Sequence, residues 1–142
     1  MNKTIINEAI VLAGGSGKRL RPFTYYTSKH LLPVGNVPMI TYPLVNLALL
    51  GVERVIMVIN PEHESQWLAL LCRKNFPFEI ELVKQIKPNG ISHAVSLCGE
   101  LLKKKDFYVA LGDNIILSSS FISRFKKASE ISSSVIATFK TG

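Results

Sequence analysis

The chain has 142 residues, which is long enough for one folded domain with a single hydrophobic core. Apolar residues make up 47% of the chain and charged residues 19%, a balance that excludes an intrinsically disordered protein. The net charge of +7 indicates an anionic partner, but it does not choose among phosphates, nucleic acids and acidic surfaces.

Short apolar runs alternate with helical patterns along the chain. The apolar runs predict buried strands over residues 9–13, 54–59, 78–83, 107–111 and 134–139. The stretches between them predict helices over residues 40–50, 60–74, 92–102 and 120–129. Strands that alternate with helices indicate an α/β fold with a mainly parallel sheet and helices on both faces.

Three of the predicted strands end in residues that suit a binding site. Gly14 follows the first strand, residues 85–90 follow the third, and residues 112–114 follow the fourth. Ligands of parallel sheets gather at the carboxyl ends of the strands. The sequence therefore predicts that these three segments converge on one site.

The glycine-rich segment after the first strand predicts a phosphate-binding loop. Residues 14–17 read Gly-Gly-Ser-Gly, and Lys18 and Arg19 follow with fixed positive charge. Glycines let backbone N–H groups approach an anion closely. A Walker loop is excluded because Arg19 follows Lys18 and Leu12 stands where a glycine is needed. A dinucleotide-binding fingerprint is excluded because Leu20 occupies the place of its third glycine.

Three longer matches resemble one family of enzymes. The sequence has Gly-Gly-Ser-Gly-Lys-Arg-Leu-Arg-Pro-Phe-Thr at residues 14–24, Ser-Lys-His-Leu-Leu-Pro-Val at residues 28–34 and Pro-Met-Ile at residues 38–40. This pattern resembles the signature of the sugar-1-phosphate nucleotidyltransferases, also called nucleotide-sugar pyrophosphorylases, and is most similar to their glucose-1-phosphate thymidylyltransferase branch. Two positions depart from the pattern: Val37 stands where the family often has lysine, and Ile86 where proline often follows the glutamine.

The resemblance implies a fold and a reaction. The fold is a Rossmann-like three-layer α/β sandwich, of which residues 1–142 are the N-terminal, nucleotide-binding part and the C-terminal half is absent. The family transfers a nucleoside monophosphate from a nucleoside triphosphate to a sugar 1-phosphate and releases pyrophosphate; the branch indicates dTTP and glucose 1-phosphate. A nucleotide-binding module without efficient turnover remains the alternative, because the family's sugar-contacting residues lie beyond this stretch.

The resemblance also implies roles for individual residues. Arg19 and Lys29 are the catalytic candidates, for the leaving pyrophosphate and the α-phosphate respectively. Asp113 is the candidate ligand of a Mg²⁺ cofactor, and Gln85 offers both a donor and an acceptor to a base edge, beside which Gly90 leaves room. The remaining nucleotide-binding candidates are Leu12, Gly14, Gly15, Ser16 and Gly17.

Other polar and reactive residues receive ordinary structural interpretations. His30 and His63 are expected in a loop and a helix, and His93 is expected to pack or cap at the start of a helix. Trp67 is predicted to be a core residue, and Cys72 and Cys98 are predicted to be buried free thiols because neither belongs to a C-x-x-C pair. The Lys-Lys-Lys run at residues 103–105 is interpreted as a solvated helix C-terminus.

The expected surroundings of the protein follow from what the sequence lacks. No apolar run is long enough to cross a bilayer and no signal-peptide pattern opens the chain, so we expect a cytoplasmic protein without a membrane partner. No recognised nucleic-acid motif accompanies the positive charge, so we expect no nucleic-acid partner. Homo-oligomers are common in the family, which makes a homo-oligomer possible here.

Overall fold

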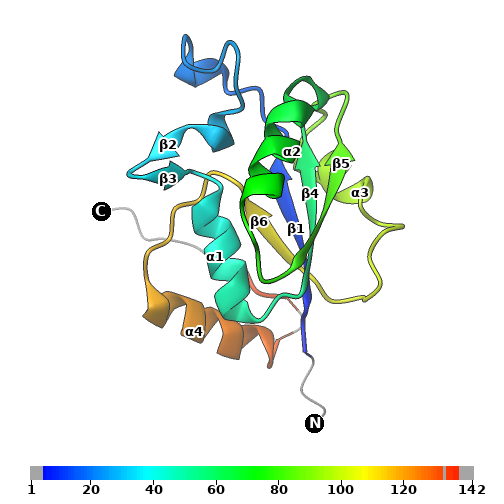
Figure 1. Ribbon diagram of the computed structural model, residues 1–142. Coiled ribbons are helices and arrows are strands. Elements are labelled where there is room, and N and C mark those ends of the chain that lie inside the picture. Colours follow the sequence, from blue (N-terminus) through cyan, green and yellow to red (C-terminus); the bar gives the residue numbers. More distant parts are fainter. Residues whose placement is uncertain (1–4, 133, 138–142) are drawn as a thin grey trace.

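The computed structural model describes residues 5–132 and 134–137, and a four-stranded parallel sheet lies at its centre (Figure 1). The strand order is β5-β4-β1-β6. Each strand lies within one residue of its predicted bounds. The strands are β1 (Glu8–Ala13), β4 (Arg54–Ile59), β5 (Glu79–Lys84) and β6 (Tyr108–Leu111).

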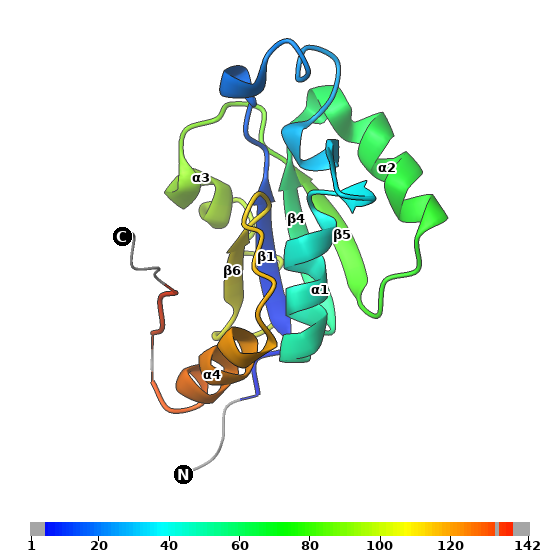
Figure 2. The ribbon, with the colours of Figure 1, turned by 90° about the vertical axis from the view of Figure 1, so that its left-hand side faces the viewer.

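Helices cover both faces of this sheet, as the alternation of elements predicted. The helices are α1 (Thr41–Leu50), α2 (Glu64–Arg73), α3 (Ile91–Ser96) and α4 (Ser119–Ser129). Residues of α1, α2 and α4 pack in one core cluster against one face of the sheet, whereas α3 packs in a second cluster against the other face. Figure 2 shows α3 on one side of the strands and α1 and α2 on the opposite side. The three-layer α/β fold is confirmed.

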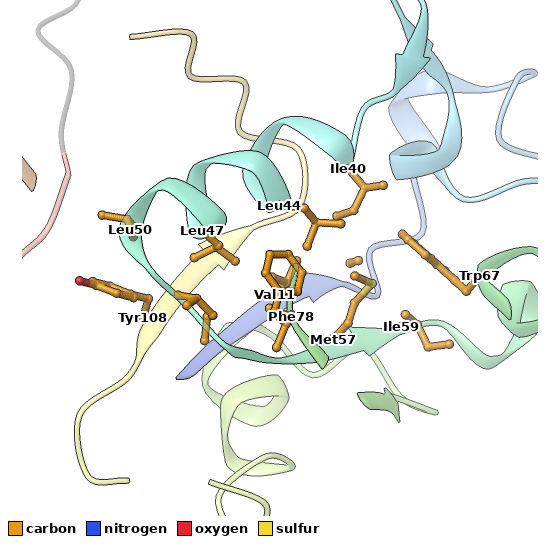
Figure 3. Packing of buried hydrophobic residues seen from close by; sticks show 14 of the residues in the cluster. Val11, Ile40, Leu44, Leu47, Leu50, Met57, Ile59, Trp67, Phe78 and Tyr108 are labelled. Atoms are coloured by element: carbon orange, nitrogen blue, oxygen red, sulfur yellow. The ribbon is translucent and has the colours of Figure 1, made fainter. Parts of the chain in front are cut away.

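The larger core lies between α1 and the sheet (Figure 3). Val11 and Met57 point into it from adjacent strands, and Leu44 and Leu47 meet them from α1. Trp67 of α2 is fully buried in the same cluster, which confirms its prediction as a core residue. Each large apolar side chain buried in this way contributes roughly 1.5–3 kcal/mol relative to an exposed one.

The path of the chain through the sheet creates a place for a ligand. From β1 the chain moves outward to β4 and then to β5, and it afterwards crosses to β6 on the other side of β1. The direction of winding therefore reverses between β1 and β6. In open α/β sheets, ligands bind beside the carboxyl ends of the strands at such a point of reversal.

Three elements differ from their predictions. The helix predicted over residues 92–102 ends at Ser96 and continues as separate turns, in which Gly99 donates to the carbonyl of Ser96 at 3.2 Å; glycine is a poor helix former. A short antiparallel pair, β2 (Pro33–Val34) with β3 (Val37–Pro38), was not predicted. Residues 134–137 form no strand, and the rest of the strand predicted there lies outside the described residues.

Two predictions about surface and core residues were also wrong. Cys72 is exposed, although Cys98 is buried as predicted. In α2 the face that meets the sheet carries Trp67 and Leu70, and the helical period turns Cys72 away from that face. The lysine run at residues 103–105 follows the turns after α3 rather than a helix end. Within the described residues, no helix has the length and apolar character to cross a bilayer.

Candidate functional site

A pocket of about 280 Å³ opens at the carboxyl ends of the strands, at the point where the winding reverses. It brings together residues from the ends of β1, β5 and β6, as predicted from the strand ends. Seven of the predicted site residues line it: Leu12, Gly14, Gly15, Lys29, Gln85, Gly90 and Asp113.

The glycine-rich loop leaves β1 beside this pocket and runs outward, away from the sheet, to the upper left of Figure 1 above β2. Gly17 adopts a left-handed conformation with φ of 61°, which favours glycine. A Cβ at this position would also lie 2.9 Å from Cγ2 of Thr24. The Thr24 hydroxyl donates to the Gly17 carbonyl at 2.7 Å, so this buried threonine fixes the end of the loop.

Three predicted residues of the loop lie outside the pocket. Ser16, Gly17 and Arg19 are absent from its lining, and Ser16 and Arg19 are exposed. Arg19 belongs to a single 3-10 turn, Lys18–Leu20, that follows Gly17. The structure therefore brings Gly14 and Gly15 to the pocket but leaves the guanidinium group of Arg19 in solvent.

Lys29 and Asp113 form an ion pair in the pocket between Nζ and Oδ2. Gly15 lies alongside the lysine, since a Cβ on Gly15 would be 3.5 Å from Cε of Lys29. Partial burial alone would raise the pKa of the Asp113 carboxyl, but the hydrogen bond and charge of Lys29 outweigh it and lower that pKa. The two charges therefore neutralise each other when no ligand is bound.

Gly112 allows β6 to approach β1 closely at the base of the pocket. Its N–H donates to the carbonyl of Leu12 at 2.9 Å. A Cβ here would lie 3.0 Å from that carbonyl oxygen and 2.8 Å from Cδ2 of His30. The absence of a side chain at Gly112 thus sets the position from which the next residue, Asp113, reaches Lys29.

His30 is a buried residue of the pocket wall rather than the ordinary loop residue predicted from sequence. It is 1% exposed, and its ring lies 6.3 Å from the ring of Trp67. Burial, reinforced by the charge of Lys29, lowers its pKa to about 4, so the imidazole is neutral at pH 7. Its Nδ1 lies 3.1 Å from the hydroxyl of Ser28.

Gln85 has a more restricted hydrogen-bonding capacity than its residue type implies. Its Nε2 donates to the carbonyl of Gly90 at 3.4 Å and lies 3.2 Å from Nδ1 of His93. The side-chain amide has only two hydrogens, and these two contacts account for both. His93, predicted to pack or cap, contacts Gln85 instead; its place three residues after Gly90 was the one signal in the sequence.

The described residues contain no group of three or more histidine, cysteine or acidic side chains that could hold a metal ion. Asp113 is the acidic residue among those lining the pocket. Any metal bound here would therefore need further ligands from a bound molecule or from water.

Comparison with known proteins identifies the family. The nucleotidyl transferase family matches residues 8–142, and the chain belongs to that family. A curated relative, the glucose-1-phosphate thymidylyltransferase of Neisseria meningitidis serogroup A, is 38% identical over 122 residues. That match covers 85% of this chain but only 42% of the relative. The chain thus spans less than half the length of this relative.

Solved structures agree with the fold. A Bacillus anthracis protein that is provisionally named a glucose-1-phosphate thymidylyltransferase, solved in complex with a sucrose, has a TM-score of 0.75 and 32% identity. The match covers 84% of this chain and 50% of that one. The inositol-1-phosphate CTP transferase of T. maritima has a TM-score of 0.70 and 27% identity, over 80% of this chain and 46% of that one.

Proposed function

We propose that this chain is the nucleotide-binding part of a sugar-1-phosphate nucleotidyltransferase that uses dTTP and glucose 1-phosphate. The observation that carries the proposal is the convergence of a glycine-rich loop, a lysine, a glutamine and an aspartate in one pocket. The name of the Neisseria relative supports the choice of substrates.

In the proposed reaction, an oxygen of the sugar phosphate attacks the α-phosphorus of the triphosphate. A new P–O bond forms there, the bond from the α-phosphorus to the bridging oxygen breaks, and pyrophosphate leaves. Both reactants are polyanions, so the protein has to offset their repulsion and align them. No nucleophile from the protein is required.

The residues divide this work by their positions. Gly14 and Gly15 hold the nucleotide at the pocket, while Ser16 and Gly17 continue the loop outward along the phosphates. Lys29 supplies a compact charge at the α-phosphate once an anion competes for it with Asp113. We assign to Arg19, which lies farther along the loop and is exposed, the binding of the β- and γ-phosphates that become pyrophosphate, since a guanidinium group suits phosphate oxygens.

Asp113 suits a Mg²⁺ ion that the triphosphate brings with it. Mg²⁺ prefers oxygen ligands and is often held by one or two carboxylates together with substrate phosphates. A single carboxylate beside a phosphate loop fits that pattern. When bound, the ion would neutralise phosphate charge as it develops.

The test is Mg²⁺-dependent release of pyrophosphate from a panel of nucleoside triphosphates and sugar 1-phosphates. Release from dTTP should require glucose 1-phosphate and should fall about 100-fold or more in Lys29→Ala and in Asp113→Asn. Lys127→Ala is the matched control, since this exposed lysine lies on α4 at the opposite end of the sheet (Figure 1). Equal losses in the control would refute a role specific to the pocket.

A second candidate function is a nucleotide-binding module without efficient turnover. It is favoured because predicted nucleotide-binding residues such as Gly14 and Gln85 line the pocket, whereas Arg19, the candidate for the leaving pyrophosphate, lies in solvent outside it. This alternative predicts triphosphate binding that Arg19→Ala weakens, without pyrophosphate release from any pair of substrates.

A further inference from the structure

Gln85 lies in the wall of the pocket with its side-chain amide held in one orientation. It is only 7% exposed, and the pocket reaches it between Gly14 and Gly90. The amide could in principle turn by half a rotation and exchange its oxygen for its nitrogen. Its two neighbours decide between these orientations.

The carbonyl group of Gly90 gives the first reason for the orientation of the Gln85 amide. A backbone carbonyl oxygen can only accept a hydrogen bond, so the amide atom facing it at 3.4 Å is the nitrogen Nε2 of Gln85. The opposite orientation would set two oxygens against each other.

The imidazole ring of His93 gives the second reason for this orientation. The same Nε2 lies 3.2 Å from Nδ1 of His93. Because Nε2 of Gln85 carries only hydrogens, Nδ1 of His93 has to present its lone pair, which corresponds to the tautomer with the ring proton on Nε2 of the histidine. Both amide hydrogens of Gln85 are used by these two acceptors.

The carbonyl oxygen of Gln85 is left for the pocket. Among the described residues no donor is hydrogen-bonded to Oε1. Gly14 stands in front of it, and a Cβ on Gly14 would lie 2.9 Å from Oε1. The glycine therefore leaves open the space that a ligand needs to reach this acceptor.

We propose that His93 is a positioning residue that holds the Gln85 amide with Oε1 toward the pocket, so that the site selects a base with a ring N–H. Thymine and uracil carry a hydrogen on N3, which can donate to Oε1 of Gln85. In cytosine N3 carries a lone pair instead, so N3 and Oε1 would face each other as two acceptors without a hydrogen bond. This inference rests on the proposed function for the nucleotide, and what it adds is the positioning residue His93.

Two variants of His93 separate orientation from packing. His93→Leu removes the acceptor at 3.2 Å and leaves only the longer contact with the Gly90 carbonyl, at 3.4 Å, to orient the Gln85 amide. His93→Asn keeps an acceptor, since Oδ1 of asparagine lies as many bonds from the backbone as Nδ1 of histidine. Thermal unfolding of both variants checks that α3 still packs.

The first experiment measures the affinities of dTTP and dCTP for the full chain with Mg²⁺. An unpaired buried acceptor typically costs enough to change an affinity by about 10-fold or more, so we expect dTTP to bind at least about 10-fold more tightly than dCTP. His93→Leu should lower this ratio, because only the Gly90 carbonyl then orients the amide, and His93→Asn should restore most of it. An unchanged ratio in a folded His93→Leu variant overturns the proposal, as does equal binding of the two nucleotides to the original chain.

The second experiment does not depend on nucleotide binding. Nitrogen-15 NMR of the ligand-free chain should show His93 with Nδ1 unprotonated and Nε2 protonated, and Gln85→Leu should perturb the Nδ1 signal. A proton on Nδ1 overturns the proposed orientation. If neither nucleotide bound while the NMR result held, the proposed function would fail and the base-selection rule with it, but the positioning of Gln85 by His93 would stand.

Discussion

Gly112 illustrates how one residue fixes the geometry of the pocket. It has an ordinary negative φ, so the need for glycine comes from the close approach of β6 to β1 rather than from the backbone conformation. The nearest atoms to an added Cβ are those of His30 and the Leu12 carbonyl, and a strand backbone cannot easily move aside. Asp113 depends on this contact for its position beside Lys29.

We therefore predict that Gly112→Ala destabilises the protein by about 1–3 kcal/mol through overpacking. The free energy of unfolding, measured in urea, tests this. Gly99→Ala is the matched control, because an added Cβ there meets its nearest atom, a carbonyl oxygen, at 3.4 Å. Equal stability of the two variants would contradict the close approach described at Gly112.

Thr24 gives a second prediction for a single residue. Thr24→Val keeps the shape of the side chain but removes the hydrogen bond from its hydroxyl to the Gly17 carbonyl, which then keeps only the backbone N–H of Leu20 as a donor, so unfolding should become easier by about 1 kcal/mol. Binding of dTTP should weaken as well, because the glycine-rich loop loses its anchor.

The control for Thr24 is Thr27→Val. Thr27 donates to Oε1 of Gln66 at 2.8 Å and does not hold the glycine-rich loop. We expect a similar loss of stability with unchanged affinity for dTTP. The role of Thr24 in the loop is wrong if dTTP binds to Thr24→Val as tightly as to the original chain.

At the scale of elements, an ionic cluster joins the amino-terminal ends of the strands, away from the pocket. Glu8 of β1 accepts from Arg54 of β4 at 2.7 Å, and from the backbone N–H groups of Lys103 and Lys104 at 2.9 and 2.8 Å. Arg54 also pairs with Glu81 of β5. Burial alone would raise the pKa of the Glu8 carboxyl, but the hydrogen bonds from Arg54 and the two amides lower it below its ordinary 4.5.

We predict that Glu8→Gln costs about 1–2 kcal/mol of stability at pH 7, because it removes one of the two carboxylates that pair with a nearly buried guanidinium and leaves only Glu81. The folded-state pKa of Glu8 is depressed, so its contribution is complete above pH 4.5 and is lost as the pH falls through the folded-state pKa. Urea unfolding at pH 7 and at pH 3 should show the difference between original and variant shrinking with acidification. The exposed Glu79→Gln is the control, with an expected change within about 0.5 kcal/mol.

The strands and the glycine-rich segment could be predicted from the sequence because their causes are local. Every residue of β4 after Arg54 is apolar, because helices cover the sheet on both of its faces. The segments after β1, β5 and β6 could be placed in one site by the rule for parallel sheets alone.

The roles of the histidines could not be predicted because their causes are distant in sequence. His30 is buried by contacts with Trp67 and Gly112, which lie in other elements. The contact of His93 with Gln85 requires α3 to turn back beside the end of β5. The exposure of Cys72 likewise depends on which face of α2 meets the sheet.

At the scale of the whole molecule, one side of the sheet carries exposed apolar residues. Val109 and Leu111 of β6 pair with Ile10 and Leu12 of β1 and share their face, the one that α3 covers. The two β6 residues nevertheless remain 47% and 36% exposed. In the described part of the sheet β6 pairs only with β1, and an edge strand with apolar side chains favours association.

We predict that this chain associates as its concentration rises, and that Val109→Lys reduces the association. Sedimentation velocity over a range of concentrations measures this. Val45→Lys is the matched control, since Val45 is 51% exposed but lies on α1. A monomer at every concentration, or a larger effect of Val45→Lys, would show that the β6 surface does not drive association.

Under the proposed function, the pair formed by Lys29 and Asp113 links the two kinds of ligand proposed for this site, a nucleotide and a divalent cation. While Lys29 and Asp113 are paired, Asp113 hinders an anion from binding to Lys29, and Lys29 hinders a cation from binding to Asp113. An anion that draws Lys29 away uncovers a carboxylate, and a divalent cation that captures Asp113 releases an ammonium group. Each ligand therefore promotes the binding of the other, and by thermodynamic reciprocity it does so by the same factor. Under the proposed function, we therefore expect the pocket to bind a nucleotide together with its counter-ion more readily than either one alone.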